Sequence, residues 1–237
     1  MERSRDWLPW GAMRPKALFS IGTLLFHVEQ NISSEILLLL VQEELHVRGL
    51  AGRLGTNHTT VLRRLQKLVK ENAIDKRTEG KNTVYFVKKT IEGRNRVMMA
   101  EYCRLSRLLK RYPYLRAPVK TLMAHREIPL ALVFGSHAKG TATERSDIDV
   151  FLETKEKTLK QELEKKYPRL SVKIGDFDPA SPLVREMMKG HVIVKGVERY
   201  YDATGFWLPP ARRSRDPTWP SPTASWNRPG SCGRPNT

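Results

Sequence analysis

The chain has 237 residues, of which 42 are Lys or Arg and 25 are Asp or Glu, so its formal charge at pH 7 is +17. This excess of positive charge attracts phosphate-bearing partners, and nucleic acid is the first partner that it predicts. The length suffices for two modest domains that each bury a core without cross-links, so a fold held together by disulfides is not expected.

The two cysteines, Cys103 and Cys232, are too few and too far apart for a disulfide framework or a zinc cluster, and they predict a reducing, cytoplasmic location. The longest apolar run, residues 36–41, is far shorter than the roughly 18 to 20 residues of a membrane span, so no membrane association is expected.

Residues 1–31 are treated as an N-terminal extension in which Met13 is an alternative start. Residues 207–237 are rich in Pro, Ser and Arg and predict a disordered tail, either native or from a read-through or frame shift.

Three helical patterns separated by short turns follow residue 32. The first is expected to begin after Ser33 and Ser34, which can cap it, and to run to about residue 45. The second covers about residues 47–54 and ends at Gly55. The third begins at a cap, Thr56 or Asn57, and continues to about residue 72, with its apolar side chains on one face and polar or basic ones on the other.

Two β-rich stretches, residues 74–78 and 83–88, flank a turn-prone segment and predict a hairpin. Three helices followed by a basic hairpin resemble the winged helix-turn-helix family over residues 32–90, with 57–72 as the recognition helix and 75–89 as the wing. The resemblance implies that the chain binds DNA. Base edges would be contacted by Thr59, Thr60 and Arg63, and phosphates by Lys67, Lys70, Lys76, Arg77 and Lys81.

The alternative is a solvated basic face on a domain that binds proteins. DNA is favoured because acidic side chains are scarce between residues 51 and 126, where only Glu71, Asp75, Glu79, Glu92 and Glu101 occur. Residues 91–127 form a helical linker in this interpretation. Its apolar stripe over residues 91–109 either packs against the domains or makes a homodimer contact.

From residue 128 the pattern becomes α/β. An apolar strand, residues 129–134, stops at Gly135 and Ser136, a short helix ends at Gly140, and a second strand covers residues 146–153. Side chains two apart on a strand point the same way, about 7 Å apart at Cα, so Asp147 and Asp149 can hold Mg²⁺ or Mn²⁺. The glycine allows close backbone approach to a phosphate, and the Ser136 hydroxyl can donate to it.

The run Gly-Ser-His-Ala-Lys-Gly, followed by Thr-Ala-Thr-Glu-Arg and Ser-Asp-Ile-Asp-Val, resembles the DNA polymerase beta-like nucleotidyltransferase superfamily, most closely its minimal branch. The resemblance covers residues 128–201 of a domain placed at 128–206. It implies an α/β (α+β) fold with a small mixed sheet and an NTP substrate. It also implies that Gly135 and Ser136 bind the nucleotide and that Asp147 and Asp149 are the metal-binding, catalytic residues. Taken singly, the Gly-Ser and Ser-Asp pairs would be ordinary turn residues, but their joint spacing favours the site.

Active members of that superfamily add a third carboxylate from the next strand, predicted at residues 170–174. There Ser171 and Lys173 would lie on the aspartate face, unless a longer strand or a bulge brings Asp176 or Asp178 inward. His137 is expected to be exposed.

Two hypotheses remain for the function. The first is a DNA-binding protein that transfers a nucleotidyl group to a protein or nucleic acid acceptor. The second is a transcriptional regulator whose catalytically silent domain senses a nucleotide or binds a partner protein, and Lys173 facing the aspartates would favour nucleotide sensing.

Overall fold

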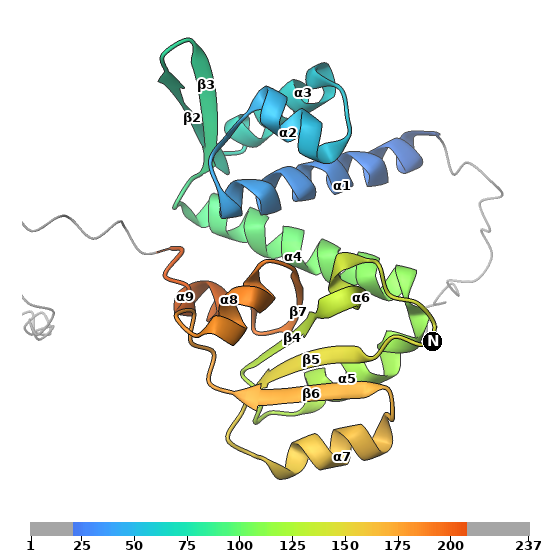
Figure 1. Ribbon diagram of the computed structural model, residues 1–237. Helices are drawn as coiled ribbons and strands as arrows, with labels where there is room; N and C mark the ends of the chain where they lie inside the picture. Colours follow the sequence, from blue (N-terminus) through green and yellow to red (C-terminus); the bar gives the residue numbers. More distant parts are fainter. Residues whose placement is uncertain (1–20, 208–237) are drawn as a thin grey trace, which may run out of the picture. The chain divides into compact units, whose positions relative to one another are not determined.

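A computed structural model describes residues 21–207 of the chain, with side chains from residue 32 onward. The described residues belong to one unit that ends at Trp207 (Figure 1). The alternative start at Met13 and the tail predicted beyond Trp207 lie outside these residues. Trp207 itself packs against the rings of Phe206 and Tyr201, with centroids 4.7 and 5.7 Å away.

The N-terminal half begins with helix α1, Ile21–Gln42. Its start differs from the prediction, because Ser33 and Ser34 lie inside the helix and do not cap it. The preceding residues contain no proline and continue the helix, and Ser34 is buried there. Strand β1, Leu45–His46, and helix α2, Val47–Leu54, follow.

Helix α3, His58–Lys70, ends the helical part of this half. The predicted local signals are confirmed: Gly55 has a φ of 57° after α2, and the Asn57 side chain accepts a hydrogen bond of 2.7 Å from the Thr60 amide. Each of these residues caps a helix end whose free backbone groups lie within one turn of it. Such local signals can be recognised from the sequence.

The hairpin comprises β2, Ile74–Glu79, and β3, Asn82–Val87. The turn is made at Gly80, which has a φ of 59°. Strand β3 pairs with both neighbours, so the sheet order is β1-β3-β2. A helix, a short strand, two further helices and a terminal hairpin, in this order, form a winged helix-turn-helix domain, as predicted.

Helix α4, Ile91–Arg111, runs between the two halves of the described chain (Figure 1). Its N-terminal part shares a core with α1, through Val97 and Ala100, whereas Leu105 and Leu108 pack against the sheet of the C-terminal half. The segment predicted as a linker is therefore shared by both cores. A 3₁₀ turn, η1 at Pro113–Leu115, leads into α5, Arg116–Ala124.

The C-terminal half is a four-stranded mixed sheet of order β6-β5-β4-β7, which confirms the predicted fold class. Its strands are β4 (Leu130–Phe134), β5 (Ile148–Glu153), β6 (Leu170–Gly175) and β7 (His191–Lys195). Only β5 and β6 run parallel, and the other pairs are antiparallel. The connecting helices are α6 (Gly135–Lys139), α7 (Thr158–Lys166), α8 (Pro182–Met188) and α9 (Val197–Ala203).

The strands alternate between two cores. One face, with Val150 and Leu152, packs with α5 and α7, and the other, with Leu132, Phe151 and Ile193, packs with α8 and α9. Within the described part of the chain, no helix is both long and apolar enough to cross a bilayer.

Candidate nucleotide site and DNA-binding surface

The Gly-Ser turn and the aspartate strand meet at one point of the C-terminal sheet. Gly135 joins β4 to α6 with a φ of 68°, and a Cβ at this position would overlap Oδ2 of Asp149. The antiparallel pairing of β4 with β5 brings these two residues together. Glycine is required here twice, once for the backbone conformation and once for the space that the carboxylate occupies.

Asp147 and Asp149 differ in their surroundings. Strand β5 begins at Ile148, so Asp147 precedes it and is exposed, whereas Asp149 is half-buried. Burial raises the pKa of Asp149, and the charge of Asp147 raises it further, while His137 and Lys173 lower it. A half-buried carboxylate with a second carboxylate close by is suited to hold a divalent cation that the two share. Among residues 32–207, no group of three or more His, Cys, Asp or Glu side chains is arranged to hold a metal.

The neighbouring strand β6 contributes no acid to this face. Asp149 pairs with Ser171 and Phe151 with Lys173, and paired residues of parallel strands project to the same side of the sheet. Lys173 therefore lies on the aspartate face, and its charge lowers the pKa of Asp149. The strand register therefore confirms the prediction that Ser171 and Lys173 of β6 lie on the aspartate face of the sheet.

The alternative prediction, that Asp176 or Asp178 supplies a third carboxylate to the site, is wrong. Strand β6 does extend to Gly175, but Gly175 pairs with Glu153, four residues beyond Asp149, which is roughly 13 Å along the strand. Asp176 lines a cavity with Glu127 and Glu153 at that far end. Asp178 accepts a hydrogen bond of 2.8 Å from the Ala180 amide in the turn before α8.

His137 is not exposed, contrary to the prediction. Only 1% of its surface is accessible, and its ring lies edge-on against Tyr112 with centroids 5.1 Å apart. Its Nε2 is 2.9 Å from the hydroxyl of Tyr114. Burial lowers the pKa of His137, and Arg169 lowers it further. The short helix α6 packs onto the aromatic residues after α4, and the sequence around His137 could not indicate that contact.

Two arginines hold the loop between α6 and β5. Arg111 donates a hydrogen bond of 2.5 Å to the Gly140 carbonyl, and Arg169 donates one of 2.9 Å to the Ser146 carbonyl. The Arg169 guanidinium also lies 4.8 Å from the centre of the Tyr114 ring. Neither residue was predicted to contact this loop, because both are distant from it in sequence.

The predicted DNA contacts lie on one side of α3 and on the wing. Thr60 is partly exposed, and the other residues are exposed: Thr59, Arg63, Lys67, Lys70, Lys76, Arg77 and Lys81. Lys70 and Lys76 line a cavity of about 380 Å³ between α3 and the wing, together with Gln66 and Tyr85. This surface carries the positive charge that attracts a DNA backbone.

Arg77 differs from its neighbours. It forms ion pairs with Glu44 and, at 2.7 Å, with Glu79, and the hydrogen bond with Glu44 is the main reason that its pKa is raised. Part of its charge is thus neutralised within the protein. Glu44 lies outside the wing, so the local sequence around Arg77 did not reveal this pairing.

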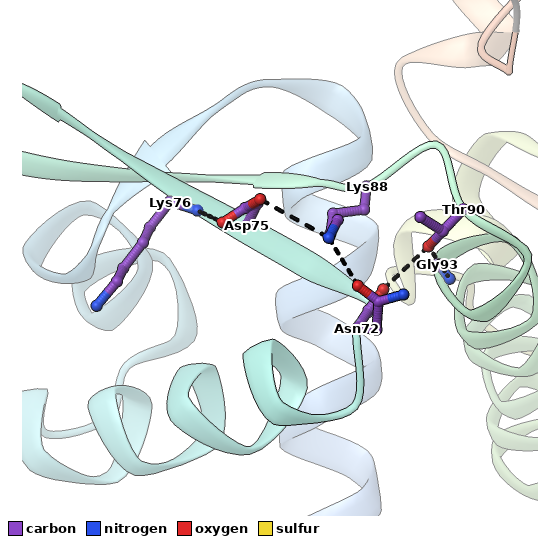
Figure 2. A network of polar contacts seen from close by, with 6 residues as sticks. All are labelled: Asn72, Asp75, Lys76, Lys88, Thr90 and Gly93. Atoms are coloured by element: carbon purple, nitrogen blue, oxygen red, sulfur yellow. Dashed lines mark hydrogen bonds and ion pairs between the residues drawn. The ribbon is translucent and has the colours of Figure 1, made fainter.

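A polar network joins α3, the wing and α4 (Figure 2). Asn72, with a φ of 57°, accepts a hydrogen bond of 2.6 Å from the Lys88 ammonium at its side chain and one of 3.0 Å from the Thr90 hydroxyl at its carbonyl. Thr90 in turn accepts a hydrogen bond of 3.2 Å from the Gly93 amide at the start of α4. The end of the recognition helix is therefore fixed to the helix that reaches the C-terminal half.

Residues 119–198 match the family model described as Polymerase beta, Nucleotidyltransferase. They form a nucleotidyltransferase domain of the polymerase beta family. The match includes the Gly-Ser turn, both aspartates and all four strands of the C-terminal sheet.

Similar solved structures include the adhesin competence repressor AdcR from Streptococcus pyogenes, at 21% identity over 39% of this chain and 77% of the other, with a TM-score of 0.30. Reduced HlyU from Vibrio cholerae is 23% identical over 38% and 86%, with a TM-score of 0.28. A toxin-antitoxin structure with AMP-PNP is 20% identical over 44% and 79%, with a TM-score of 0.28. No match was found among curated proteins. The winged helix-turn-helix assignment rests on the element order and sheet topology of this chain.

Proposed function

We propose that the protein is a DNA-binding transcriptional regulator whose nucleotidyltransferase domain binds a nucleoside triphosphate with Mg²⁺, so that DNA binding responds to the nucleotide. The observation that carries this proposal is the composition of β6, which places Ser171 and Lys173, and no carboxylate, beside Asp149. A transcriptional regulator must be in the same compartment as its DNA, and we propose that this compartment is the cytoplasm.

The nucleotide site would divide its tasks among five residues. Gly135 and Ser136 would bind the phosphates through backbone amides and a hydroxyl, while Asp147 and Asp149 would hold the metal ion. Such an ion neutralises phosphate charge when it is bound. The ammonium of Lys173 adds a fixed positive charge beside Asp149, which favours binding of the polyphosphate but lowers the affinity for a second cation.

The DNA-binding part of the proposal is supported by the exposed basic side chains of α3 and the wing. Lys67, Lys70, Lys76 and Lys81 would bind phosphates, with a smaller share for the paired Arg77. Thr59, Thr60 and Arg63 would face base edges in the major groove. The network at Asn72 supports a mechanical link from this surface to α4 and hence to the nucleotidyltransferase domain.

A second candidate function is nucleotidyl transfer to a protein or nucleic acid acceptor. The complete Gly-Ser and Asp-x-Asp set favours it. In that reaction an acceptor oxygen attacks the α-phosphorus and pyrophosphate leaves. The acceptor's proton would have no carboxylate on β6 to receive it, which is why we rank transfer second.

Nucleotide binding is tested by calorimetric titration of the full chain with each of the four NTPs and Mg²⁺. Asp149→Asn should weaken the preferred NTP at least tenfold, because one metal ligand loses its charge. Asp178→Asn is the matched control, since its carboxylate lies in the turn before α8, and it should bind as the wild type does. Equal affinities for wild type and Asp149→Asn would reject the site.

Regulation and transfer are separated by two further measurements. The affinity for a labelled DNA duplex, selected by the protein from a random pool, should change with the preferred NTP in wild type but not in Asp149→Asn. DNA affinity that no NTP changes would reject the regulatory proposal. Transfer of label from an α-labelled NTP to an acceptor in cell extract, lost in Asp149→Asn, would establish the second candidate instead.

A further inference from the structure

A cavity of about 450 Å³ lies where α1, α4, α8, β7 and α9 meet. Leu38 and Val41 of α1 and Met188 of α8 contribute apolar side chains to its wall, and Tyr200 of α9 closes another side. None of the residues of the nucleotide site lines this cavity. Its volume is in the range of small-molecule sites, which are mostly apolar with a few polar groups.

His191, at the start of β7, is an unpartnered polar side chain in this wall. It is 5% exposed, and neither ring nitrogen makes a hydrogen bond within the described part of the chain. Burial lowers its pKa to about 4, so the ring is neutral at pH 7 and has one donor and one acceptor nitrogen. The nearby carbonyls of Met187 and Met188 can only accept, so the acceptor nitrogen still lacks a donor.

Glu101 of α4 is the second incompletely bonded group. It is 2% exposed, its Oε1 accepts a hydrogen bond of 2.8 Å from the Tyr201 hydroxyl, and its Oε2 accepts none. The nearest cation, Arg104, is 3.9 Å from Oε2, too far for a hydrogen bond. Glu101 and His191 are thus two buried groups with unused bonding capacity in the wall of one cavity.

The charge of the cavity selects the kind of molecule. Arg104, Arg185 and Lys189 line it, and among the side chains that the structure describes Glu101 is the only acidic one that does. Arg185 donates to the Ala180 carbonyl and Lys189 to Glu186, so both are partly engaged elsewhere. Arg104 makes no hydrogen bond to the described residues beyond its long ion pair with Glu101, and its side chain is 24% exposed. Its guanidinium is therefore available to an anion.

We propose that this cavity binds a small monoanion with a flat apolar body, of the aromatic carboxylate class, with the carboxylate on Arg104 and the ring between Leu38, Met188 and Tyr200. The acceptor nitrogen of His191 would accept a hydrogen bond from a hydroxyl or amino substituent of the ring. The site does not depend on the nucleotide proposal. Because its walls come from α1 of the winged helix domain and from α8 and α9, the ligand would hold the two halves together.

The test is a fluorescence titration of the full chain with 8-anilinonaphthalene-1-sulfonate, an aromatic anion. We expect saturable one-to-one binding that Arg104→Gln weakens at least tenfold. Arg96→Gln is the matched control on the same helix, because Arg96 pairs with Glu71 away from the cavity, and it should change the affinity less than twofold. Both variants should unfold at the wild-type temperature.

A competition experiment on wild type examines the charge preference separately. The probe should be displaced by 1-naphthoate and not by 1-naphthylmethanol, which has the same ring without the charge. If Arg104→Gln does not fold, Val41→Trp, which fills the cavity from α1, should abolish binding. The proposal is overturned by the absence of saturable binding, by equal effects of Arg104→Gln and Arg96→Gln, by equal displacement by both competitors, or by undiminished binding in Val41→Trp.

Discussion

The two halves of the protein place their polar side chains in opposite surroundings. On α3 and the wing, cations such as Lys67 and Lys76 are exposed and spread over a surface, so their effect on DNA is a sum of similar charges. In the C-terminal half, Asp149 is half-buried against Gly135, and His191 is buried, so each group depends on the packing immediately around it. We therefore expect substitutions in the N-terminal half to have graded, salt-dependent effects on DNA binding. Substitutions in the C-terminal half should have all-or-none effects.

The largest effect is expected from acid, through His191. Its pKa of about 4 lies below the usual 6.5, so between these pH values the unfolded chain binds a proton that the folded chain does not. Stability is therefore lost as pH falls from 6.5 to 4, by about 3 kcal/mol from this group. Glu101, whose raised pKa acts in the opposite direction, reduces the net loss.

Urea unfolding of wild type and His191→Gln at pH 7.5 and 4.5 measures the contribution of His191. On going from pH 7.5 to pH 4.5, the free energy of unfolding should fall less in His191→Gln than in wild type. His58→Gln, at an exposed position on α3, is the control and should keep the wild-type profile. A parallel shift of all three proteins would show that burial in the C-terminal half has no special role.

The second effect compares two glycines with similar backbone conformations. Gly135→Ala should weaken nucleotide binding about a hundredfold, because the added Cβ displaces Asp149 as well as straining a φ of 68°. Gly80→Ala in the wing has the same kind of strain, at a φ of 59°, but meets nothing within 4 Å. It should change DNA affinity less than threefold. Calorimetry with Mg²⁺-NTP and a duplex-binding assay measure the two, and similar small losses for both would contradict the comparison.

The third effect tests summation on the basic surface. Replacing Lys67 and Lys70 together by Ala should weaken DNA binding roughly tenfold and make the slope of log affinity against log salt shallower by about 1.8, because two phosphate contacts are lost. Lys165→Ala, an exposed lysine of α7, is the control and should leave the slope unchanged. An unchanged slope in the double variant would place the DNA on another face.

The smallest effect distinguishes adjacent residues of the wing. Lys76→Ala should reduce the salt slope by about 0.9, as one phosphate contact does. Arg77→Ala should reduce it much less, because Glu44 and Glu79 already neutralise part of this charge. Glu44→Gln should strengthen DNA binding slightly by releasing Arg77. Equal slopes for Lys76→Ala and Arg77→Ala would mean that the ion pairs open on DNA.

Elements with local end signals were predicted closely. The bounds of α2 agree with the prediction, since Gly55 ends the helix. The start of α1 was wrong, because serine is tolerated inside a helix whose apolar face is packed against α3 and α4. The predicted exposure of His137 was wrong for the same kind of reason, since aromatic rings from another segment cover it.

The sequence by itself determined the order of the elements, the Gly-Ser and Asp-x-Asp motifs and the basic face of α3, because these depend on neighbours within a few residues or on one strand. Tertiary structure decided which residues stand beside those motifs. The register of β6 placed Lys173 near Asp149 and Asp176 at the far end of the sheet, and the packing of α1 against the wing brought Glu44 to Arg77. Pairing between distant segments depends on how whole helices and strands pack, and the spacing of residues along the chain does not indicate it.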